Sequence, residues 1–97
     1  MSNIPGGFGE TKDADEEIQK LCDQVKAQVE EKTRGDYEVF TAVQYREQVV
    51  AGMNYIIKVD VGGSSYLHIK VFKNLSGEIM LSSLEEDHSK DDPIEPF

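Results

Sequence analysis

The chain has 97 residues, enough for one compact domain, and its composition of 38% hydrophobic and 30% charged residues is ordinary for a globular protein. Ten Lys and Arg residues against nineteen Asp and Glu residues give a net charge of -9. This negative charge argues against nucleic acid and against anionic membranes as partners, because both are bound through basic surfaces.

The first 12 residues are expected to form a flexible arm, because they are rich in glycine and show neither helical nor strand periodicity. They contain neither the basic region nor the apolar stretch of a signal peptide. No run in the chain reaches the roughly 18 apolar residues that a membrane span needs. The only cysteine, Cys22, cannot form an intrachain disulfide, which favours a reducing compartment. These observations together predict a cytoplasmic protein.

An amphipathic helix is expected over residues 15–33. Acidic residues at its start, such as Glu16 and Glu17, suit the positive end of the helix dipole, and Gly35 can adopt the left-handed conformation that ends a helix. One apolar stripe with helical spacing should face the core. It consists of Ile18, Leu21, Cys22, Val25 and Val29.

After the helix the apolar residues alternate, which indicates antiparallel strands with one buried and one wet face. The predicted strands are residues 37–49, 53–61, 66–71 and 78–84, with odd-numbered residues facing inward in the first three. The helix can bury its stripe only against the apolar face of this sheet. The prediction is therefore an α+β protein, a single domain over residues 1–97, with one long helix on a curved antiparallel sheet and a solvated acidic tail at residues 84–97.

The hairpin between the first two predicted strands is unusually apolar. Hairpin turns are normally polar, whereas this one contains Val49, Val50 and Ala51, and only Gly52 suits a positive φ angle. Either the valines finish the first strand, or they mark a contact site on a loop. Alternation allows Val49 into the core but places Val50 on the polar face. The pattern alone leaves both interpretations open.

At this loop the sequence resembles a known family. Residues 48–52, Gln-Val-Val-Ala-Gly, resemble the central motif of the cystatin superfamily, and the chain as a whole resembles the stefins, which lack disulfides and signal peptides. Residues 4–7, which include Gly6, are similar to the N-terminal stretch of stefins. Residues 29–32 are similar to the end of their helix, and residues 70–73 to their third strand.

The resemblance implies the cystatin fold and a reversible, tight-binding inhibitor of papain-like cysteine proteases such as cathepsins. In stefins the N-terminal arm and two hairpin loops form a wedge that occludes the active-site cleft, and the arm turns away before the catalytic cysteine can cleave it. A monomer with a minor domain-swapped dimer is also implied. The second loop departs from the family, because Leu75 is followed by serine where stefins usually have proline. The implied protease-binding residues are Pro5, Gly6, Gly7, Gln48, Val49, Val50, Ala51, Gly52, Leu75 and Ser76.

Two other function classes are less consistent with the sequence. An enzyme is not expected, because Cys22 belongs to the buried stripe and His68 lies on the polar face of its strand, too far apart for a dyad. His88 with Asp91 and Asp92 has metal-ligand chemistry, but acidic tails produce such spacings by accident, and no cofactor is expected. The remaining alternative is a non-inhibitory protein-interaction module on the same fold, which would bind a basic partner.

Overall fold

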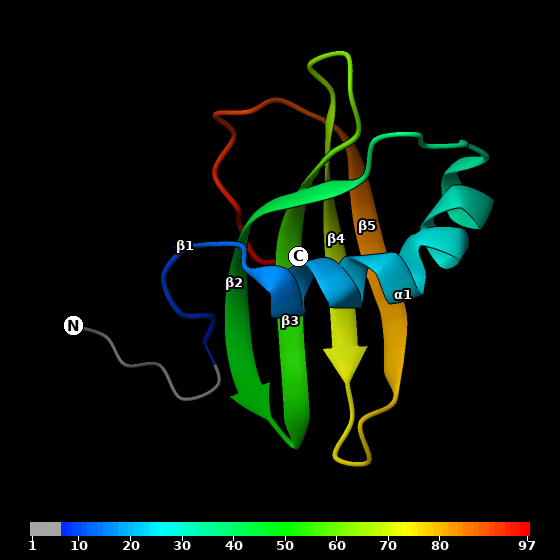
Figure 1. Ribbon diagram of the computed structural model, residues 1–97. Helices are drawn as coiled ribbons and strands as arrows, with labels where there is room; N and C mark the ends of the chain where they lie inside the picture. The colour runs from blue at the N-terminus through cyan, green and yellow to red at the C-terminus, as the bar shows by residue number, and fades with distance from the viewer. Residues whose placement is uncertain (1–6) are drawn as a thin grey trace.

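In the computed structural model, which describes residues 7–97, one helix lies across a five-stranded antiparallel sheet (Figure 1). Along the sheet the strands follow their order in the chain, so every neighbouring pair is antiparallel and the predicted α+β class is confirmed. No helix within residues 7–97 is long and apolar enough to cross a membrane. The elements are β1 (Lys12–Asp13), α1 (Glu16–Thr33), β2 (Thr41–Val50), β3 (Gly52–Asp60), β4 (Tyr66–Lys73) and β5 (Ile79–His88).

Helix α1 has the extent that the apolar period predicts. Its N-cap is Asp15, whose side chain accepts a hydrogen bond from the Ile18 backbone N–H at 3.0 Å. The left-handed residue at the other end is Arg34, with a φ of 58°, so the prediction of Gly35 for this role was wrong. Gly35 is needed for space instead, because a Cβ there would lie 2.9 Å from the ring of Tyr37. All five residues of the predicted stripe are buried.

Strand β2 departs from simple alternation near its start. The pairing of β2 with β3 shifts register between Ala42 and Gln44. An extra residue in one strand reverses which parity faces the core. Phe40, before the irregularity, and Tyr45, after it, are therefore both buried, and the predicted inward position Val39 is exposed. In β3 and β4 five of the predicted inward residues are buried, namely Ile57, Val59, Leu67, Ile69 and Val71. Met53 and Tyr55, nearer the start of β3, are only half-buried.

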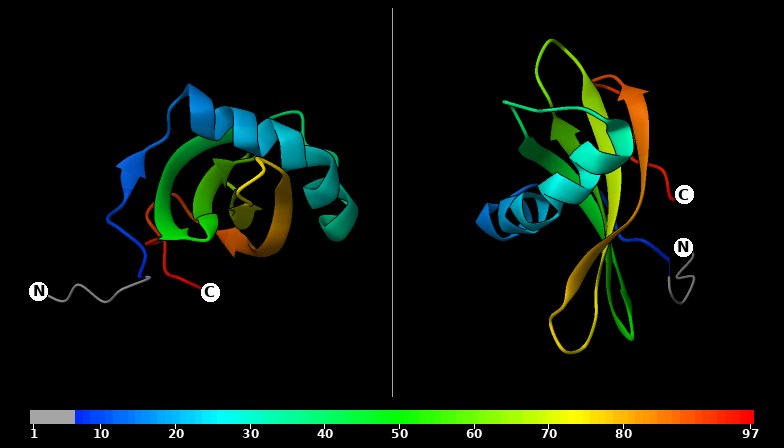
Figure 2. Two further views of the ribbon diagram at one scale, coloured as in Figure 1. Left: turned by 90° about the horizontal axis from the view of Figure 1, so that it is seen from below. Right: turned by 90° about the vertical axis from the view of Figure 1, so that its right-hand side faces the viewer.

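The outward face of the sheet is covered by the C-terminal segment, defined here as residues 89–97. Figure 2 shows this segment and α1 on opposite faces of the sheet. Ile94 is only 3% exposed, and Ile56 on the outward face of β3 is fully buried. The predicted wet face was therefore wrong where this segment covers it, whereas five of the six acidic side chains in residues 84–97 are exposed, as expected of a solvated tail. Three cations on neighbouring strands donate to backbone carbonyls of the segment at 2.6–2.8 Å: Arg46 to Ile94, Lys58 to Lys90 and Asp92, and Lys70 to Phe97.

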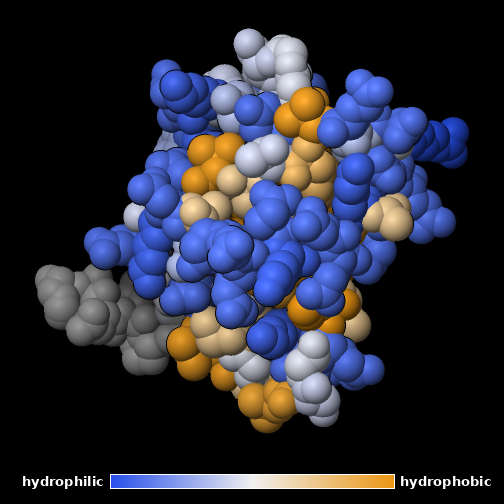
Figure 3. Space-filling view, in the orientation of Figure 1, coloured by the Kyte–Doolittle hydropathy of each residue, from blue (hydrophilic) through white to orange (hydrophobic). Residues whose placement is uncertain are grey.

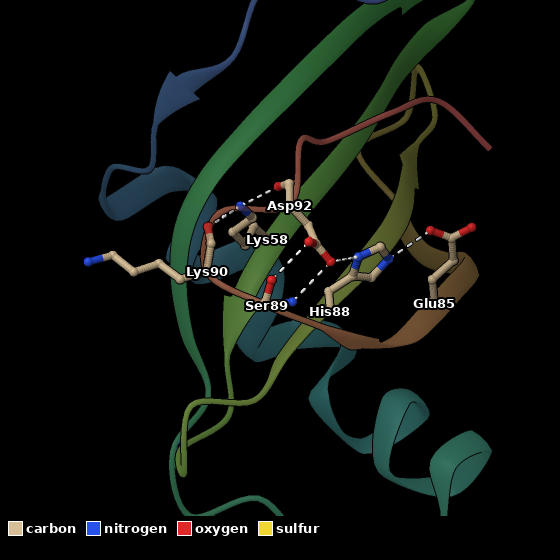
Figure 4. A network of polar contacts seen from close by, with 6 residues as sticks. All are labelled: Lys58, Glu85, His88, Ser89, Lys90 and Asp92. Atoms are coloured by element: carbon tan, nitrogen blue, oxygen red, sulfur yellow. Dashed lines mark hydrogen bonds and ion pairs between the residues drawn. The ribbon is translucent and has the colours of Figure 1, made fainter.

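A polar cluster fastens the start of the C-terminal segment (Figure 4). His88 bonds Asp92 through Nδ1 and Glu85 through Nε2, each at 2.9 Å. The Asp92 carboxylate also accepts from the backbone N–H and the hydroxyl of Ser89, at 3.0 and 2.8 Å. The ring of His88 stacks on that of His68, with centroids 3.6 Å apart and planes 8° from parallel. His68 is 1% exposed, and its Nε2 has no hydrogen-bond partner among residues 7–97.

Candidate functional site

Two hairpins project beyond helix α1 at one end of the sheet (Figure 1). We call this end, made of residues 48–52 and 74–77, the hairpin edge. The two turns contact each other through backbone, because a Cβ on Gly52 would collide with the carbonyl oxygen of Lys73 and lie 3.2 Å from Cα of Asn74. Gly52 also has a φ of 107°, which favours glycine. The hairpin edge is thus a single surface built from two loops.

The tips of both hairpins are apolar and exposed. Val49 is 73% exposed, Val50 38% and Leu75 83%, and Figure 3 shows apolar surface at the lower end, where the hairpins lie. The sequence argument ranked the two valines in the wrong order. Val49 lies on the same face of β2 as the core residue Tyr45, but it is the last residue but one of the strand. Figure 1 shows that this end of β2 extends beyond α1, so no helix covers it. Alternation predicts the face of a residue, and burial also requires a partner above that face.

The turn between β4 and β5 is organised by Asn74, a residue that the sequence interpretation missed. Its Oδ1 accepts from the backbone N–H groups of Ser76 and Glu78, both at 2.9 Å, and its Nδ2 donates to Glu78 Oε1 at 2.8 Å. The backbone N–H of Gly77, whose φ is 89°, donates to the Asn74 carbonyl at 3.0 Å. Asparagine at the start of a turn with glycine three residues later is a signal that could have identified it.

The root of the N-terminal arm runs along β2 towards the hairpin edge. The backbone N–H of Gly9 donates to the Glu47 carbonyl at 2.8 Å. The guanidinium of Arg46 donates to the carbonyls of Gly9 at 2.6 Å and Phe8 at 3.2 Å, while it also holds the C-terminal segment. Sequence reasoning missed Arg46 as well, because its partners are backbone carbonyls far away in the sequence.

The structure brings together most of the predicted site residues. Ala51 and Ser76 are exposed in their turns, and Gln48 accepts a hydrogen bond from Asn54 Nδ2 at 2.8 Å across the hairpin. In the arm Gly7 is exposed. The two remaining positions, Pro5 and Gly6, lie outside the described residues.

The one candidate nucleophile that the sequence offered, the thiol of Cys22, is poorly placed for catalysis. Cys22 is fully buried, and burial raises the pKa of its thiol to about 12, so that the nucleophilic thiolate is not formed near neutral pH.

His68, Glu85 and His88 bring their ligand atoms within 4.8 Å of one another. The two imidazole rings are parallel and stacked, however, so their in-plane lone pairs do not converge on one ion, and zinc bound to histidine needs such convergence at about 2.0–2.1 Å. Both nitrogens of His88 are already bonded to carboxylates. The hydrogen bonds of His88 and Ser89 to Asp92 instead hold the start of the C-terminal segment in place.

Comparison with known proteins identifies the family. A family model described as a cystatin domain matches residues 6–91. The chain belongs to the cystatin family. Cystatin-A of Mus musculus is 50% identical over 96 residues, which cover 97% of this chain and 99% of that protein. Cystatin-B of Oplegnathus fasciatus is 46% identical over 100 residues and all of both chains. Relatives of these two kinds confirm the resemblance to the stefins.

A third relative has a name that states an activity. The protein named leukocyte cysteine proteinase inhibitor 1 of Sus scrofa is 46% identical over 97 residues, which cover 97% of this cystatin and 94% of that protein.

Proposed function

We propose that this cystatin is a reversible, tight-binding inhibitor of papain-like cysteine proteases of the cathepsin type, which occludes their active-site cleft with its N-terminal arm and two hairpin loops. The observation that carries the proposal is the hairpin edge, where Val49 and Leu75 are exposed at the tips of two hairpins in backbone contact. Exposed apolar residues gathered at one end of a scaffold mark a contact site. The relative named as a cysteine proteinase inhibitor supports this class of target.

The mechanism that we propose is occlusion without a chemical step. Complete burial of a valine or leucine side chain contributes roughly 1.5–3 kcal/mol, so the three exposed residues Val49, Val50 and Leu75 can supply much of a tight interaction. Hydrogen bonds of Asn74 hold the second turn, and the first turn packs against it, which favours a low entropic cost of association. In the arm, Gly6 has no side chain and would let the backbone bend away from the protease nucleophile.

The test is a titration of papain and a cathepsin with the purified protein, together with a Val49→Asp, Val50→Asp double variant. Because each valine is proposed to lose its apolar contact, we expect the inhibition constant Ki to rise at least about a hundredfold. Val39→Asp is the matched control, since Val39 is also an exposed valine but precedes the other end of β2. Its Ki should be unchanged.

Two outcomes would count against the proposal. Absence of inhibition by the unchanged protein at micromolar concentration would favour the non-inhibitory interaction module. Unfolding of the double variant, measured by circular dichroism, would mean that the two valines stabilise the fold and do not serve mainly as a contact surface.

We further propose that the protein works in the cytoplasm, mainly as a monomer. A single buried thiol, Cys22, suits a reducing compartment because it needs no disulfide partner. Opening of the hairpin at residues 48–52, followed by exchange of strands between two copies, would give a domain-swapped dimer. Size-exclusion chromatography before and after heating measures how much of this dimer forms.

A further inference from the structure

We propose that Asn74 is a positioning residue for inhibition: its side chain holds the turn between β4 and β5, and with it Leu75, in the conformation that the protease cleft meets. The inference rests on the proposed inhibitory function and adds to it a residue outside the predicted site. Asn74 is only half-buried at the start of the turn, and it is not proposed to touch the protease.

The hydrogen bonds of Asn74 close the turn from one side to the other. Its Oδ1 accepts two backbone N–H groups, those of Ser76 and Glu78, and its Nδ2 donates to the Glu78 carboxylate. Its own backbone N–H donates to the Glu78 carbonyl at 2.9 Å. With the bond from the Gly77 N–H to its carbonyl, five hydrogen bonds begin or end on Asn74, and three of them depend on its side chain.

The hydrogen bonds of Asn74 restrain a turn that has no proline to restrain it. A proline at position 76 would fix its own φ near -65° and restrict the residue before it, which is Leu75. Serine has no such covalent restriction, so this sequence alone would be expected to leave the turn mobile. The side chain of Asn74 supplies a hydrogen-bonded restraint over the same residues.

The position of Asn74 extends its influence to the first hairpin. Its Cα is one of the atoms nearest to the space above Gly52, so the start of the second turn packs directly against the end of the first. A change in the path of the chain at Asn74 would therefore alter the spacing between the tips that carry Val49 and Leu75. Both tips must enter one cleft, so this spacing matters for binding.

A purely structural role for Asn74 predicts a different result. The turn is exposed and Leu75 buries little surface, so losing the turn should cost little global stability. A small loss of stability does not change Ki while nearly all of the protein remains folded. A turn that must be ordered on binding does change Ki, because only the fraction in the competent conformation can bind.

The experiment compares Ki for papain, the thermal midpoint and amide hydrogen exchange in four variants. Asn74→Ala removes the side-chain bonds and should raise Ki about tenfold, as expected if the competent turn falls to roughly a tenth of molecules. The amides of Ser76 and Glu78 should exchange faster in this variant. Asn74→Asp keeps the acceptor oxygen for the two backbone N–H groups but replaces the Nδ2 donor beside the Glu78 carboxylate with a second negative charge, so its Ki should lie between those of the unchanged protein and of Asn74→Ala. Ser82→Ala, an exposed polar truncation on β5 outside this set of bonds, is the matched control and should behave as the unchanged protein.

The fourth variant, Asn74→Ala with Ser76→Pro, tests the reason for the effect. If Asn74 acts by restraining the turn, proline should restore Ki to within about threefold of its original value. Failure of proline to restore Ki would overturn the proposal in favour of direct contact. An unchanged Ki in Asn74→Ala, measured while Ser76 and Glu78 exchange faster, would also overturn it. If the unchanged protein does not inhibit papain at all, the proposed function fails, whereas the exchange data still decide whether Asn74 orders the turn.

Discussion

Lowering the pH from 7.5 to 5 should destabilise this cystatin through His68, which is buried in β4 against the ring of His88. Burial, followed by the charges of His88 and Lys58, lowers the pKa of His68 from 6.5 to about 4, although Glu85 and Asp92 act in the opposite direction. In the unfolded chain this histidine gains a proton near its ordinary pKa of 6.5. The unfolded state therefore binds more protons between pH 6.5 and 4, and stability falls as the pH falls through that window.

The size of this effect follows from the two pKa values. A histidine that titrates at 6.5 unfolded and about 4 folded loses about 2 kcal/mol of stability between pH 7.5 and 5, and roughly 3 kcal/mol in all. His88 opposes the loss. Partial burial lowers its pKa, but the hydrogen bonds to Glu85 and Asp92 outweigh burial and raise it overall, so its protonation stabilises the folded state at acid pH. The net loss at pH 5 should therefore be smaller than the roughly 2 kcal/mol from His68 alone, against the 5–15 kcal/mol of stability typical of domains.

Protonation of Asp92 does not contribute to the loss of stability between pH 7.5 and 5, because this carboxyl group titrates at lower pH. A backbone hydrogen bond from Ser89, followed by bonds from the side chains of His88 and Ser89, lowers the pKa of Asp92 to about 2. Its contribution to stability is present above the unfolded pKa of 3.8 and is lost only as the pH falls towards 2.

The assay is urea denaturation at several pH values between 7.5 and 5, on the unchanged protein and on His68→Gln, which keeps a polar side chain but cannot titrate. The variant should lose the part of the pH dependence that His68 causes, so that its stability rises slightly on acidification because His88 remains. A nuclear magnetic resonance titration should place the pKa of His68 near 4. A pKa near 6.5, or the same acid-induced loss of stability in the variant, would refute the reasoning.

The remaining predictions concern the arm. Gly6→Glu should raise Ki for papain more than about tenfold without changing the thermal midpoint, because a charged side chain would meet the cleft wall; an unchanged Ki would contradict the assigned role. Arg46→Ala should release both the arm and the C-terminal segment, since three hydrogen bonds to Gly9, Phe8 and Ile94 are lost. We expect faster amide exchange at Gly9 and a Ki raised about threefold to tenfold. Arg46→Lys, which cannot make the forked contact, should be intermediate, and exchange at Gly9 that stays slow in both variants would argue against this role.

The helix and the inward faces of β3 and β4 could be predicted because each has an uninterrupted apolar period. Strand β2 could be predicted only in part, since one irregularity between Ala42 and Gln44 moves Phe40 into the core. Nothing in the alternation identifies that residue beforehand. A one-residue insertion in a strand depends on how the neighbouring strand pairs, which is a property of the fold and not of the local pattern.

The larger error of the sequence analysis was to predict a solvent-exposed outward face for the sheet. The segment that covers this face lies far along the chain from most of the strands it contacts. Positive charges at Arg46, Lys58 and Lys70, opposite a tail with six acidic residues, suggest an ionic attraction. The structure instead directs all three cations to backbone carbonyls of the C-terminal segment. Backbone acceptors exist in any sequence, so composition cannot indicate them. Ile94 was a weak signal, as one apolar residue within a polar tail.

The exposure of the hairpin edge is possible because both faces of the sheet are covered elsewhere. Helix α1 covers one face of the sheet and the C-terminal segment the other, so the core is complete without Val49 and Leu75. Those side chains are therefore free to remain exposed while the strands that carry them are held firmly further along. The acid-sensitive stack of His68 and His88 lies at the other end of β4 from Lys73, which contacts the first turn. Stability and the proposed binding thus rest on different residues, and His68→Gln should alter the first while leaving Ki at neutral pH unchanged.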